Sequence, residues 1–235
     1  AAITHALAGK NVVVVTPTAS GKSLCYHLPI LNGLYQNASA LFIYPTKALA
    51  QDQTSELNLL LQGCPDADES WEAQVYDGDT PPDVRRRIRR SGRLVISNPD
   101  MLHAAILPHH DKWAHFFRSL KYVVLDELHT YRGVFGSHVA NVVRRLKRIC
   151  AHYGSDPVFL ATSATIANPK ELAEALTEQD FELVNKNGAP AAERYVCFMN
   201  PPIKDIQQMR RQSALSAAQS IAKTTLEKEC GTIVF

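Results

Sequence analysis

The sequence contains few cysteines, no long apolar run and almost no net charge. Its five cysteines are scattered and no two form a Cys-x-x-Cys pair. This spacing argues against a zinc site and a disulfide framework, and it fits a reducing compartment. The longest apolar runs are far too short to span a bilayer, and the first residues lack the order of a secretory signal. We therefore expect an intracellular protein of the cytoplasm, nucleoid or nucleus that acts without a membrane.

The composition is that of an ordinary globular protein. The chain has 235 residues, of which 46% are hydrophobic and 20% are charged, and its formal net charge is +2. This length is enough for at least one sizeable core. Basic residues gather in two stretches, Arg85, Arg86, Arg87, Arg89, Arg90 and Arg93, and Arg144, Arg145, Lys147 and Arg148. Each stretch is either a solvated helix face or a surface that attracts nucleic-acid phosphates.

Short β-rich runs alternate with longer amphipathic stretches along most of the chain. The predicted strands are residues 11–15, 40–45, 73–77, 93–98, 122–127 and 158–164. Between them, KALAQDQTSELNLLLQG and SHVANVVRRLKRIC place their leucines and valines on one helical face. This alternation predicts an α/β fold, a mostly parallel sheet with helices on both faces. In such a sheet the ligand lies at the carboxyl ends of the strands.

The pattern changes after Asn168. Residues 168–177 predict one more helix, whereas residues 181–202 are irregular and contain a glycine and three prolines, as a connector does. We expect a long helix from about Ile203 to Glu229 and then a terminal strand at 231–235.

A candidate phosphate loop joins the first predicted strand to the helix after it. Residues 12–26 read VVVVTPTASGKSLCY, so the loop ends in Gly-Lys-Ser. A phosphate cradle needs inward backbone N–H groups, a lysine for the outer phosphates and a hydroxyl for Mg²⁺. Gly21, Lys22 and Ser23 supply the second glycine of the pattern, the lysine and the hydroxyl. The strict pattern has glycine at Thr16, so an ordinary strand, turn and helix is the alternative.

Two adjacent carboxylates end another apolar run. In KYVVLDELHTYRG, residues 121–133, Asp126 and Glu127 follow YVVL directly. If the loop binds a nucleotide, Asp126 lies on the neighbouring strand and holds Mg²⁺ through water, and Glu127 takes the proton from the attacking water. The alternative is a helix N-terminus with acids on its dipole. The two segments together, each at a strand's carboxyl end, favour the nucleotide site.

These residues resemble the superfamily-two helicases. TASGKS, DELH and SAT occur in the order and spacing of that family, YPTKALAQDQ resembles its motif Ia, and DGDT (77–80) and SNPDMLH (97–103) resemble its strand-contacting motifs. DELHTYRGVFGSHVANVVRRLKRI and SATIANPKELAEAL are most similar to the MrfA/YprA-type DNA repair helicases. These enzymes carry a zinc-binding C-terminal domain and are related to the RecQ-four-like fungal enzymes. The likeness covers nearly the whole chain.

The resemblance implies a RecA-like P-loop NTPase fold, with ATP and Mg²⁺ in the cleft between two such domains. It implies catalytic roles for Lys22, Asp126 and Glu127, a metal role for Ser23 and Asp126, and phosphate binding by Thr18, Ala19, Ser20, Gly21, Lys22 and Ser23. It further implies that Ser163, Thr165 and His129 couple the ATP state to the nucleic-acid track. The residues implied to touch a single strand are Pro45, Thr46, Lys47, Gly78, Asp79, Thr80, Asn98, Pro99 and Asp100.

The sequence departs from the family pattern at both ends. No segment with the adenine-reading glutamine precedes Ala1, and no second RecA-like domain, arginine finger or zinc cysteine cluster follows Phe235. We therefore expect residues 1–183 to form the ATP-binding domain, and 184–235 a linker and the beginning of the second domain. Because loss of an arginine finger costs about 10³ to 10⁵ in rate, we expect this chain alone to bind ATP weakly and hydrolyse it slowly.

The function favoured at this point is that of an ATP-dependent DNA helicase or translocase motor domain acting in DNA repair. Its partners would be single-stranded or unwinding nucleic acid, DNA in preference, held by backbone contacts that do not read bases, and the second RecA-like domain. An RNA helicase shares the same motifs and remains an alternative. A non-motor scaffold that only binds the nucleotide is a third, although such a scaffold has no need of Glu127 to activate water.

Several histidines and aromatic residues are more simply explained as structural than as functional. His103, His109, His110 and His115 have no zinc-motif spacing and no cysteine partner, so a metal site is not expected. Trp113, Phe116 and Phe117 could stack on bases. Three aromatics beside a strand are more often part of a core.

Overall fold

The structure is a computed structural model, and it describes residues 1–17, 21–67, 69–186, 188, 193, 195–205, 207–208 and 210–233. The phosphate-loop candidates Thr18, Ala19 and Ser20 lie outside the described residues. The chain divides into two units, Ala1–Ala189 and Pro190–Phe235.

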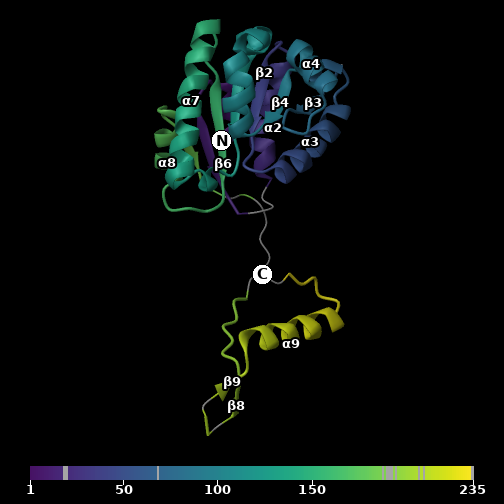
Figure 1. Cartoon of the computed structure of the whole chain (residues 1–235), viewed down its shortest axis with the longest axis vertical. Coiled ribbons are helices and arrows are strands. Elements are labelled where there is room, and N and C mark those ends of the chain that lie inside the picture. The colour runs from purple at the N-terminus through teal and green to yellow at the C-terminus, as the bar shows by residue number, and fades with distance from the viewer. Residues whose placement is uncertain are drawn as a thin grey trace. The chain divides into compact units, whose positions relative to one another are not determined.

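The first unit is built on a seven-stranded sheet in which every strand pair is parallel (Figure 1). The strands are β1 (Val12–Val15), β2 (Ser39–Ile43), β3 (Ala73–Val75), β4 (Leu94–Ser97), β5 (Leu120–Leu125), β6 (Val158–Ser163) and β7 (Glu182–Val184). Their order across the sheet is β3-β4-β2-β5-β6-β1-β7. All six strands predicted from the sequence are present, which confirms the parallel α/β fold.

Strand β7 was not predicted, because its segment was assigned to an irregular connector. It has only three residues, too few to show an alternating pattern. Two contacts with the residues just before β1 fix its position. The Glu182 N–H donates to the Asn11 carbonyl (2.8 Å), and Lys10 Nζ lies 2.7 Å from a Glu182 carboxylate oxygen. Pairing with β1 therefore forms a strand from a segment whose sequence has no marked preference for strand by itself.

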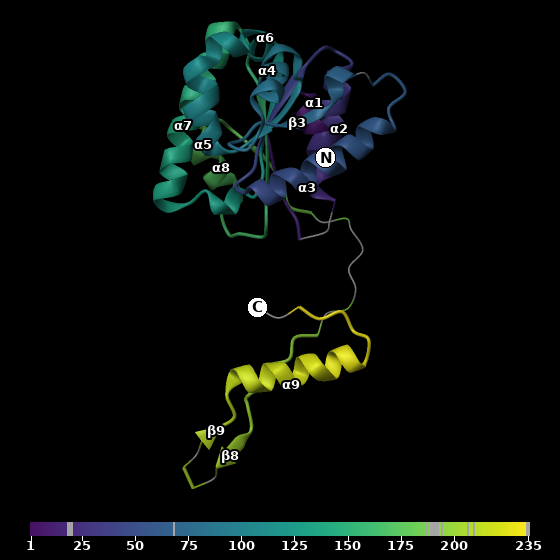
Figure 2. The ribbon, with the colours of Figure 1, turned by 45° about the vertical axis from the view of Figure 1, so that its right-hand side comes forward.

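Helices cover both faces of the sheet (Figure 2). On one face lie α1 (Ala2–Leu7), α2 (Lys22–Leu34) and α3 (Lys47–Gln62), and the short 3₁₀ turn η1 (Glu69–Trp71) packs beside them. The other face carries α4 (Pro82–Ser91), α5 (Pro99–Met101), the π-helical turn η2 (Leu102–Ile106), η3 (Leu107–Trp113), α6 (Ala114–Ser119), α7 (Gly133–Tyr153) and α8 (Pro169–Thr177). A 3₁₀ turn, η4 (Leu128–Thr130), follows β5.

The alternation of side chains along each strand fills two separate cores. In β1, Val13 and Val15 pack with α7, whereas Val12 and Val14 pack with α1 and α2. Both faces of a parallel strand are buried in this way, which is why these segments read as unbroken runs of apolar residues. Trp113, Phe116 and Phe117 are buried with the first set, so the core interpretation of these aromatics is confirmed.

The second unit contains a small hairpin and one helix. The antiparallel strands β8 (Ile203–Asp205) and β9 (Arg210–Arg211) precede α9 (Ala214–Glu227). The predicted helix from about Ile203 is therefore wrong in its first eleven residues, because the side chain of Ser213 accepts the Ser216 N–H (3.1 Å) and caps the helix there.

The terminal strand predicted at 231–235 is also not observed. Residues 231–233 form no strand, and 234–235 lie outside the described residues. Among the described residues of this unit only Ala217 is buried, and the apolar side chains of α9 are mostly exposed. None of the helices in the described ranges is both long and apolar enough to cross a membrane.

Helix α7 begins at a close backbone contact. A Cβ atom on Gly136 would lie 2.5 Å from the carbonyl oxygen of Tyr131 and 2.7 Å from its carbonyl carbon. Both neighbours are backbone atoms, so no rotation of a side chain relieves the clash. The glycine therefore allows α7 to start directly behind the segment that carries the two carboxylates.

We predict that Gly136→Ala lowers the free energy of unfolding by about 1–3 kcal/mol, because the first turn of α7 must move to admit the methyl group. The measurement is urea unfolding followed by tryptophan fluorescence, since Trp71 and Trp113 are both buried in the first unit. The neighbouring exposed position serves as control, and Ser137→Ala should change stability by less than about 0.5 kcal/mol. Equal stability of the two variants would contradict the prediction.

Candidate active site

Three strand ends converge at one edge of the sheet. Strand β6 pairs with β1 on one side and with β5 on the other, with Val15 opposite Ser163 and Leu125 opposite Ala161. The prediction that Asp126 lies on the strand next to the phosphate loop is therefore wrong, because β6 is inserted between them. Parallel register nevertheless brings Lys22 and the carboxylate segment to the end of β6, where they contact residues 162–164.

Lys22 is the first residue of α2. It follows Gly21, whose φ of 75° lies in the left-handed region that favours glycine. Lys22 Nζ donates to the backbone carbonyl of Ser163 at 3.3 Å, so its amine lies over the end of β6. The helix has no side-chain cap and no acid in its first turn. Its N-terminal N–H groups and partial positive charge are thus available to an anion beside Lys22.

Asp126 is the buried acid of this edge, with 7% of its surface exposed. The Thr162 hydroxyl donates to its Oδ1 atom, and its backbone N–H donates to the Ile43 carbonyl (3.2 Å), which extends the β2–β5 ladder by one residue. Burial, with a smaller contribution from the charge of Glu127, raises the pKa of Asp126 to about 6, although a backbone hydrogen bond and the charge of Lys22 oppose the rise.

The donor set fits a hard divalent cation. Asp126 is a carboxylate whose charge is only partly compensated, as its raised pKa shows, and Ser23 offers a hydroxyl on the first turn of α2, next to Lys22. Oxygen ligands of this kind suit Mg²⁺ held jointly by protein and phosphate. No group of three or more His, Cys, Asp or Glu side chains that could hold a metal by itself occurs in the part of the chain that the structure describes.

Glu127 turns the chain out of the sheet. Its backbone is left-handed (φ 51°, ψ 47°), and its carbonyl accepts both the N–H and the hydroxyl of Thr130 at 2.8 Å. Such a conformation in a residue other than glycine costs about 1–3 kcal/mol and is concentrated at functional sites. The turn places the Glu127 carboxylate 3.1 Å from Nδ1 of His129.

His129 connects the two carboxylates' segment to the loop after β6. Its Nδ1 atom lies within reach of Glu127 Oε2 (3.1 Å) and of the Ala164 N–H (3.4 Å). A ring nitrogen is either a donor or an acceptor. If Nδ1 carries a hydrogen it donates to the Glu127 carboxylate, and if it does not it accepts the Ala164 N–H. The histidine is thus placed where its two contacts exclude each other.

The remaining coupling candidates differ in their surroundings. The Ser163 hydroxyl is fully buried and has no hydrogen-bond partner within the described residues, whereas Thr165 is exposed. The contacts to the carboxylate segment come instead from Thr162 and Ala164, which sequence reasoning missed. Thr162 stands one residue beyond the Leu125–Ala161 pair, so only the register of β5 against β6 identifies it.

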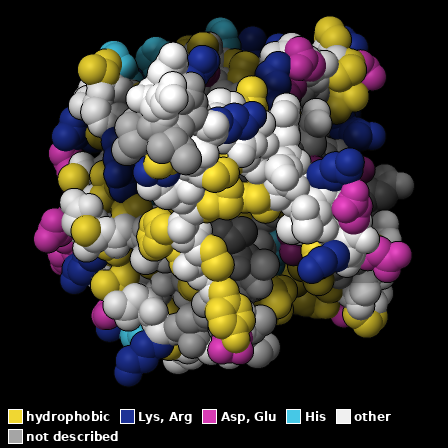
Figure 3. Space-filling view, turned by 90° about the horizontal axis from the view of Figure 1, so that it is seen from below, with side chains coloured by type: hydrophobic (Ala, Val, Ile, Leu, Met, Phe, Trp, Pro, Cys, Tyr) yellow, Lys and Arg dark blue, Asp and Glu magenta, His cyan; other side chains and the backbone are white. Residues whose placement is uncertain are grey.

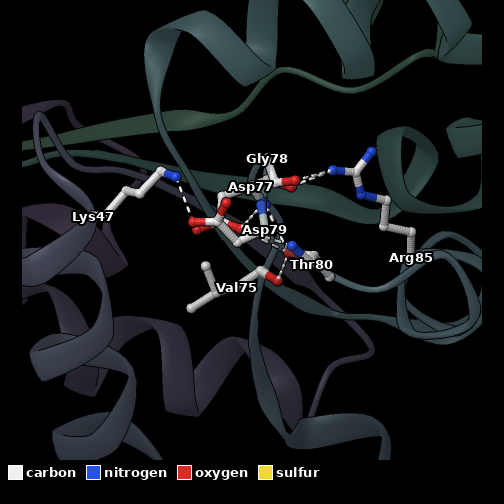
Figure 4. Close-up of polar contacts among 7 residues, drawn as sticks. All are labelled: Lys47, Val75, Asp77, Gly78, Asp79, Thr80 and Arg85. Atoms are coloured by element: carbon white, nitrogen blue, oxygen red, sulfur yellow. Dashed lines mark hydrogen bonds and ion pairs between the residues drawn. The ribbon is translucent and has the colours of Figure 1, made fainter.

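Two of the predicted nucleic-acid segments are joined at the same edge (Figure 4). Thr46 caps α3 by accepting the Leu49 N–H (3.3 Å), and Lys47 Nζ lies 2.5 Å from Asp79 Oδ2. Both Lys47 and Asp79 are exposed. The tip that carries Gly78 and Asp79 is therefore tied to the start of α3.

A tight turn holds that tip. The buried Asp77 carboxylate accepts the N–H groups of Asp79 (2.9 Å) and Thr80 (3.0 Å), and the Thr80 hydroxyl accepts the Asp77 N–H (2.9 Å). Arg85 donates to the carbonyls of Asp77 (2.7 Å) and Gly78 (2.9 Å). Arg85 therefore supports the turn instead of facing solvent. Thr80 is part of the turn, and the N-cap of α4 is Pro81.

The third predicted segment lies beside a groove. Asn98 caps α5 by accepting the Met101 N–H (2.8 Å), Pro99 is buried and Asp100 is exposed. Between this segment and α7 lies a groove of about 500 Å³, whose lining includes Asp100, His103, Phe135, His138, Arg145 and Arg148. It was not visible in the sequence, because the two walls are more than thirty residues apart.

The basic residues of α7 differ in their partners, although Arg144, Arg145 and Arg148 all line the groove. Arg144 bonds to Glu178 (2.7 Å) and Lys147 to the Thr177 carbonyl (2.7 Å), so both secure the end of α8. Arg145 and Arg148 line the groove and have no ion pair among the residues that the structure describes. Two arginines that form no ion pair within the described residues, beside a predicted nucleic-acid segment, are suited to phosphate, although Asp100 also lines the groove.

Comparisons with known proteins agree with this geometry. Residues 1–172 match the DEAD/DEAH box helicase family. The chain is 56% identical to the ATP-dependent helicase YprA of Bacillus subtilis over 97% of this chain and 30% of that protein. It is 40% identical to the ATP-dependent helicase hrq1 of Schizosaccharomyces pombe over 100% of this chain and 22% of that protein.

The fold also matches solved helicases. The crystal structure of the DUF1998 helicase MrfA bound to DNA and AMPPNP has a TM-score of 0.89 and 55% identity, over 96% of this chain and 31% of that chain. This similarity confirms the predicted RecA-like fold. The chain spans less than a third of the length of each of these three relatives.

Because the pKa of Asp126 is raised from 3.8 to about 6, its ionisation opposes folding, and stability should fall as pH rises through that interval and stay lower above it. We predict that Asp126→Asn raises the free energy of unfolding at pH 7.5 by about 1–2 kcal/mol more than at pH 4.5. Urea unfolding at the two pH values measures this difference. The exposed control Asp111→Asn should show none, and an equal gain for Asp126→Asn at both pH values would refute the assignment.

Proposed function

The chain belongs to the DEAD/DEAH box helicase family, and on that premise we propose that it is the ATP-binding motor domain of an ATP-dependent DNA helicase or translocase that acts in DNA repair. The observation that supports this most is the meeting of Lys22, Asp126 and the Ser163 carbonyl over the end of β6. A lysine, a buried acid and a helix N-terminus at one strand end are the parts that bind a triphosphate.

The residues divide the work of ATP hydrolysis between them. Gly21, Lys22 and the N-terminus of α2 would bind the phosphates, and Ser23 and Asp126 would hold Mg²⁺, which when bound neutralises phosphate charge. With a pKa of about 6, Asp126 is ionised at neutral pH and able to serve a cation. Glu127 would orient the attacking water and take its proton. His129 would then couple the nucleotide site to Ser163 at the end of β6 and to Thr165 in the loop after it.

Nucleic acid would lie along the same edge. Pro45, Thr46 and Lys47, then Gly78, Asp79 and Thr80, and then Asn98, Pro99 and Asp100 follow three adjacent strand ends, and the groove beside α7 continues this line. The net charge is only +2, and on the face shown in Figure 3 the Lys and Arg side chains are dispersed among neutral and apolar groups. Binding would thus depend on local backbone contacts, not on a general positive field.

DNA is favoured over RNA because a structure of MrfA, which is 55% identical to this chain, holds DNA. An RNA helicase remains the second candidate, and affinities for matched DNA and RNA single strands distinguish the two. We further propose that residues 1–183 form the motor domain and 184–235 lead into a second RecA-like domain. An intracellular location follows from a DNA substrate and from the scattered cysteines.

We predict that Glu127→Gln in the full-length protein abolishes ATP hydrolysis and unwinding and leaves ATP binding nearly unchanged. The amide keeps the shape of the side chain but cannot take a proton from water. Steady-state ATPase, strand-displacement and nucleotide-binding assays measure the three properties. Glu171→Gln, an exposed change on α8, is the control. Unwinding by the Glu127→Gln variant would exclude the motor assignment and favour a scaffold.

We predict that Arg145→Glu and Arg148→Glu each weaken DNA binding and reduce its salt dependence by about one slope unit, because each removes one phosphate contact. Titrations of a fluorescent single strand at several salt concentrations give the slope. Arg90→Glu on α4 makes the same change in net charge at an exposed position away from the groove. An equal effect of all three substitutions would show that net charge, and not the groove, is responsible.

A further inference from the structure

One buried hydroxyl links the phosphate-binding helix to the segment that precedes the predicted nucleic-acid contacts. Tyr26 lies one turn after Ser23 on α2 and is 2% exposed. Its hydroxyl donates to Gln53 Oε1 on α3 at 2.9 Å and lies 3.4 Å from the hydroxyl of Tyr44. Tyr44 follows β2 directly and precedes Pro45.

The direction of these bonds is determined by neighbouring groups. Gln53 Nε2 donates to Glu56 (3.0 Å), so its amide oxygen is the atom that faces Tyr26. The ring of Tyr26 packs edge-on against Phe42, with centroids 6.2 Å apart, and is already held by the core. A phenylalanine would fill that space equally well. The hydroxyl is therefore the part of Tyr26 that packing does not explain.

The same hydroxyl is close to the candidate nucleotide site. Burial and then the charge of Asp126 raise the pKa of Tyr26, and hydrogen bonds with Tyr44 and Ser23 lower it. Burial and the charge of Asp126 also raise the pKa of Tyr44. By position, Tyr26 stands between Ser23, which lies one turn before it on α2, and Gln53, to which its hydroxyl donates on α3.

We propose that the Tyr26 hydroxyl is a positioning group that couples nucleotide binding to nucleic-acid binding through Gln53. This inference rests on the proposed function. When Ser23 engages a nucleotide and its cation, the first turn of α2 adjusts, and the Tyr26–Gln53 bond transmits the adjustment to α3. Thr46 and Lys47 form the N-terminus of that helix, so the segment that would touch the strand moves with it. Coupling of this kind acts equally in both directions.

The test measures coupling and not activity alone, in the full-length protein. The quantity is the ratio of the Kd for single-stranded DNA without AMPPNP to the Kd with it. Tyr26→Phe should reduce this ratio by about 2- to 10-fold, the range that corresponds to the loss of one buried hydrogen bond. Gln53→Met, which removes the acceptor at similar volume, should reduce it as much. The double variant should lose no more than either single variant, because both remove one contact.

Tyr35→Phe is the matched control, because it removes an exposed tyrosine hydroxyl at the end of the same helix. Its ratio should equal that of the unaltered protein. Losses that add in the double variant, or an unchanged ratio in both single variants, would overturn the proposal. Should Tyr26→Phe fail to fold, Gln53→Met on partly exposed α3 still decides the question. If the unaltered protein itself shows no coupling, the proposed motor function fails, which is a different result from intact coupling in Tyr26→Phe.

Discussion

Burial of one carboxylate, that of Asp126, is the constraint on which the candidate site depends. Its surroundings supply the Thr162 hydroxyl, a backbone hydrogen bond from Glu127 and the nearby charge of Lys22, and these do not compensate a full negative charge out of water. At this edge of the sheet, the negative charge of ionised Asp126 is therefore only partly compensated. A divalent cation beside Lys22 would compensate this charge, and the oxygen atoms of Asp126 and Ser23 are ligands that suit such an ion.

The register of the parallel sheet turns this constraint into a site. Because β6 is placed between β1 and β5, its end receives Lys22 from one side and the carboxylate segment from the other. Lys22 donates to the Ser163 carbonyl at the end of β6, and His129 Nδ1 lies 3.4 Å from the N–H of Ala164, the next residue. Any displacement of Ser163 and Ala164 changes both contacts, which gives a physical basis for linking nucleotide state to the rest of a motor.

One strained backbone position and several buried hydroxyls occur near the candidate site. Glu127 adopts a left-handed conformation, the Ser163 hydroxyl is buried without a partner among the described residues, and the buried hydroxyls of Tyr26 and Tyr44 lie 3.4 Å apart. The apolar cores on either face of the sheet also bury polar atoms without partners among the described residues, those of His27 and Trp113. These cores stabilise the fold, and the edge uses part of that stability to hold groups in positions that are unfavourable without a ligand.

The sequence by itself determined the strand–helix alternation and the six longer strands, and it drew attention to Lys22 and the two carboxylates, because apolar periodicity and loop chemistry are local properties. It could not determine which strand lies beside which, so it placed Asp126 next to the phosphate loop and overlooked Thr162 and Ala164. Strand β7 and the start of α9 were missed for a related reason, since pairing with β1 and a serine cap outweigh weak local preferences. Tertiary structure alone decided the groove beside α7 and the Tyr26–Gln53 contact, because each joins residues that only folding brings within reach.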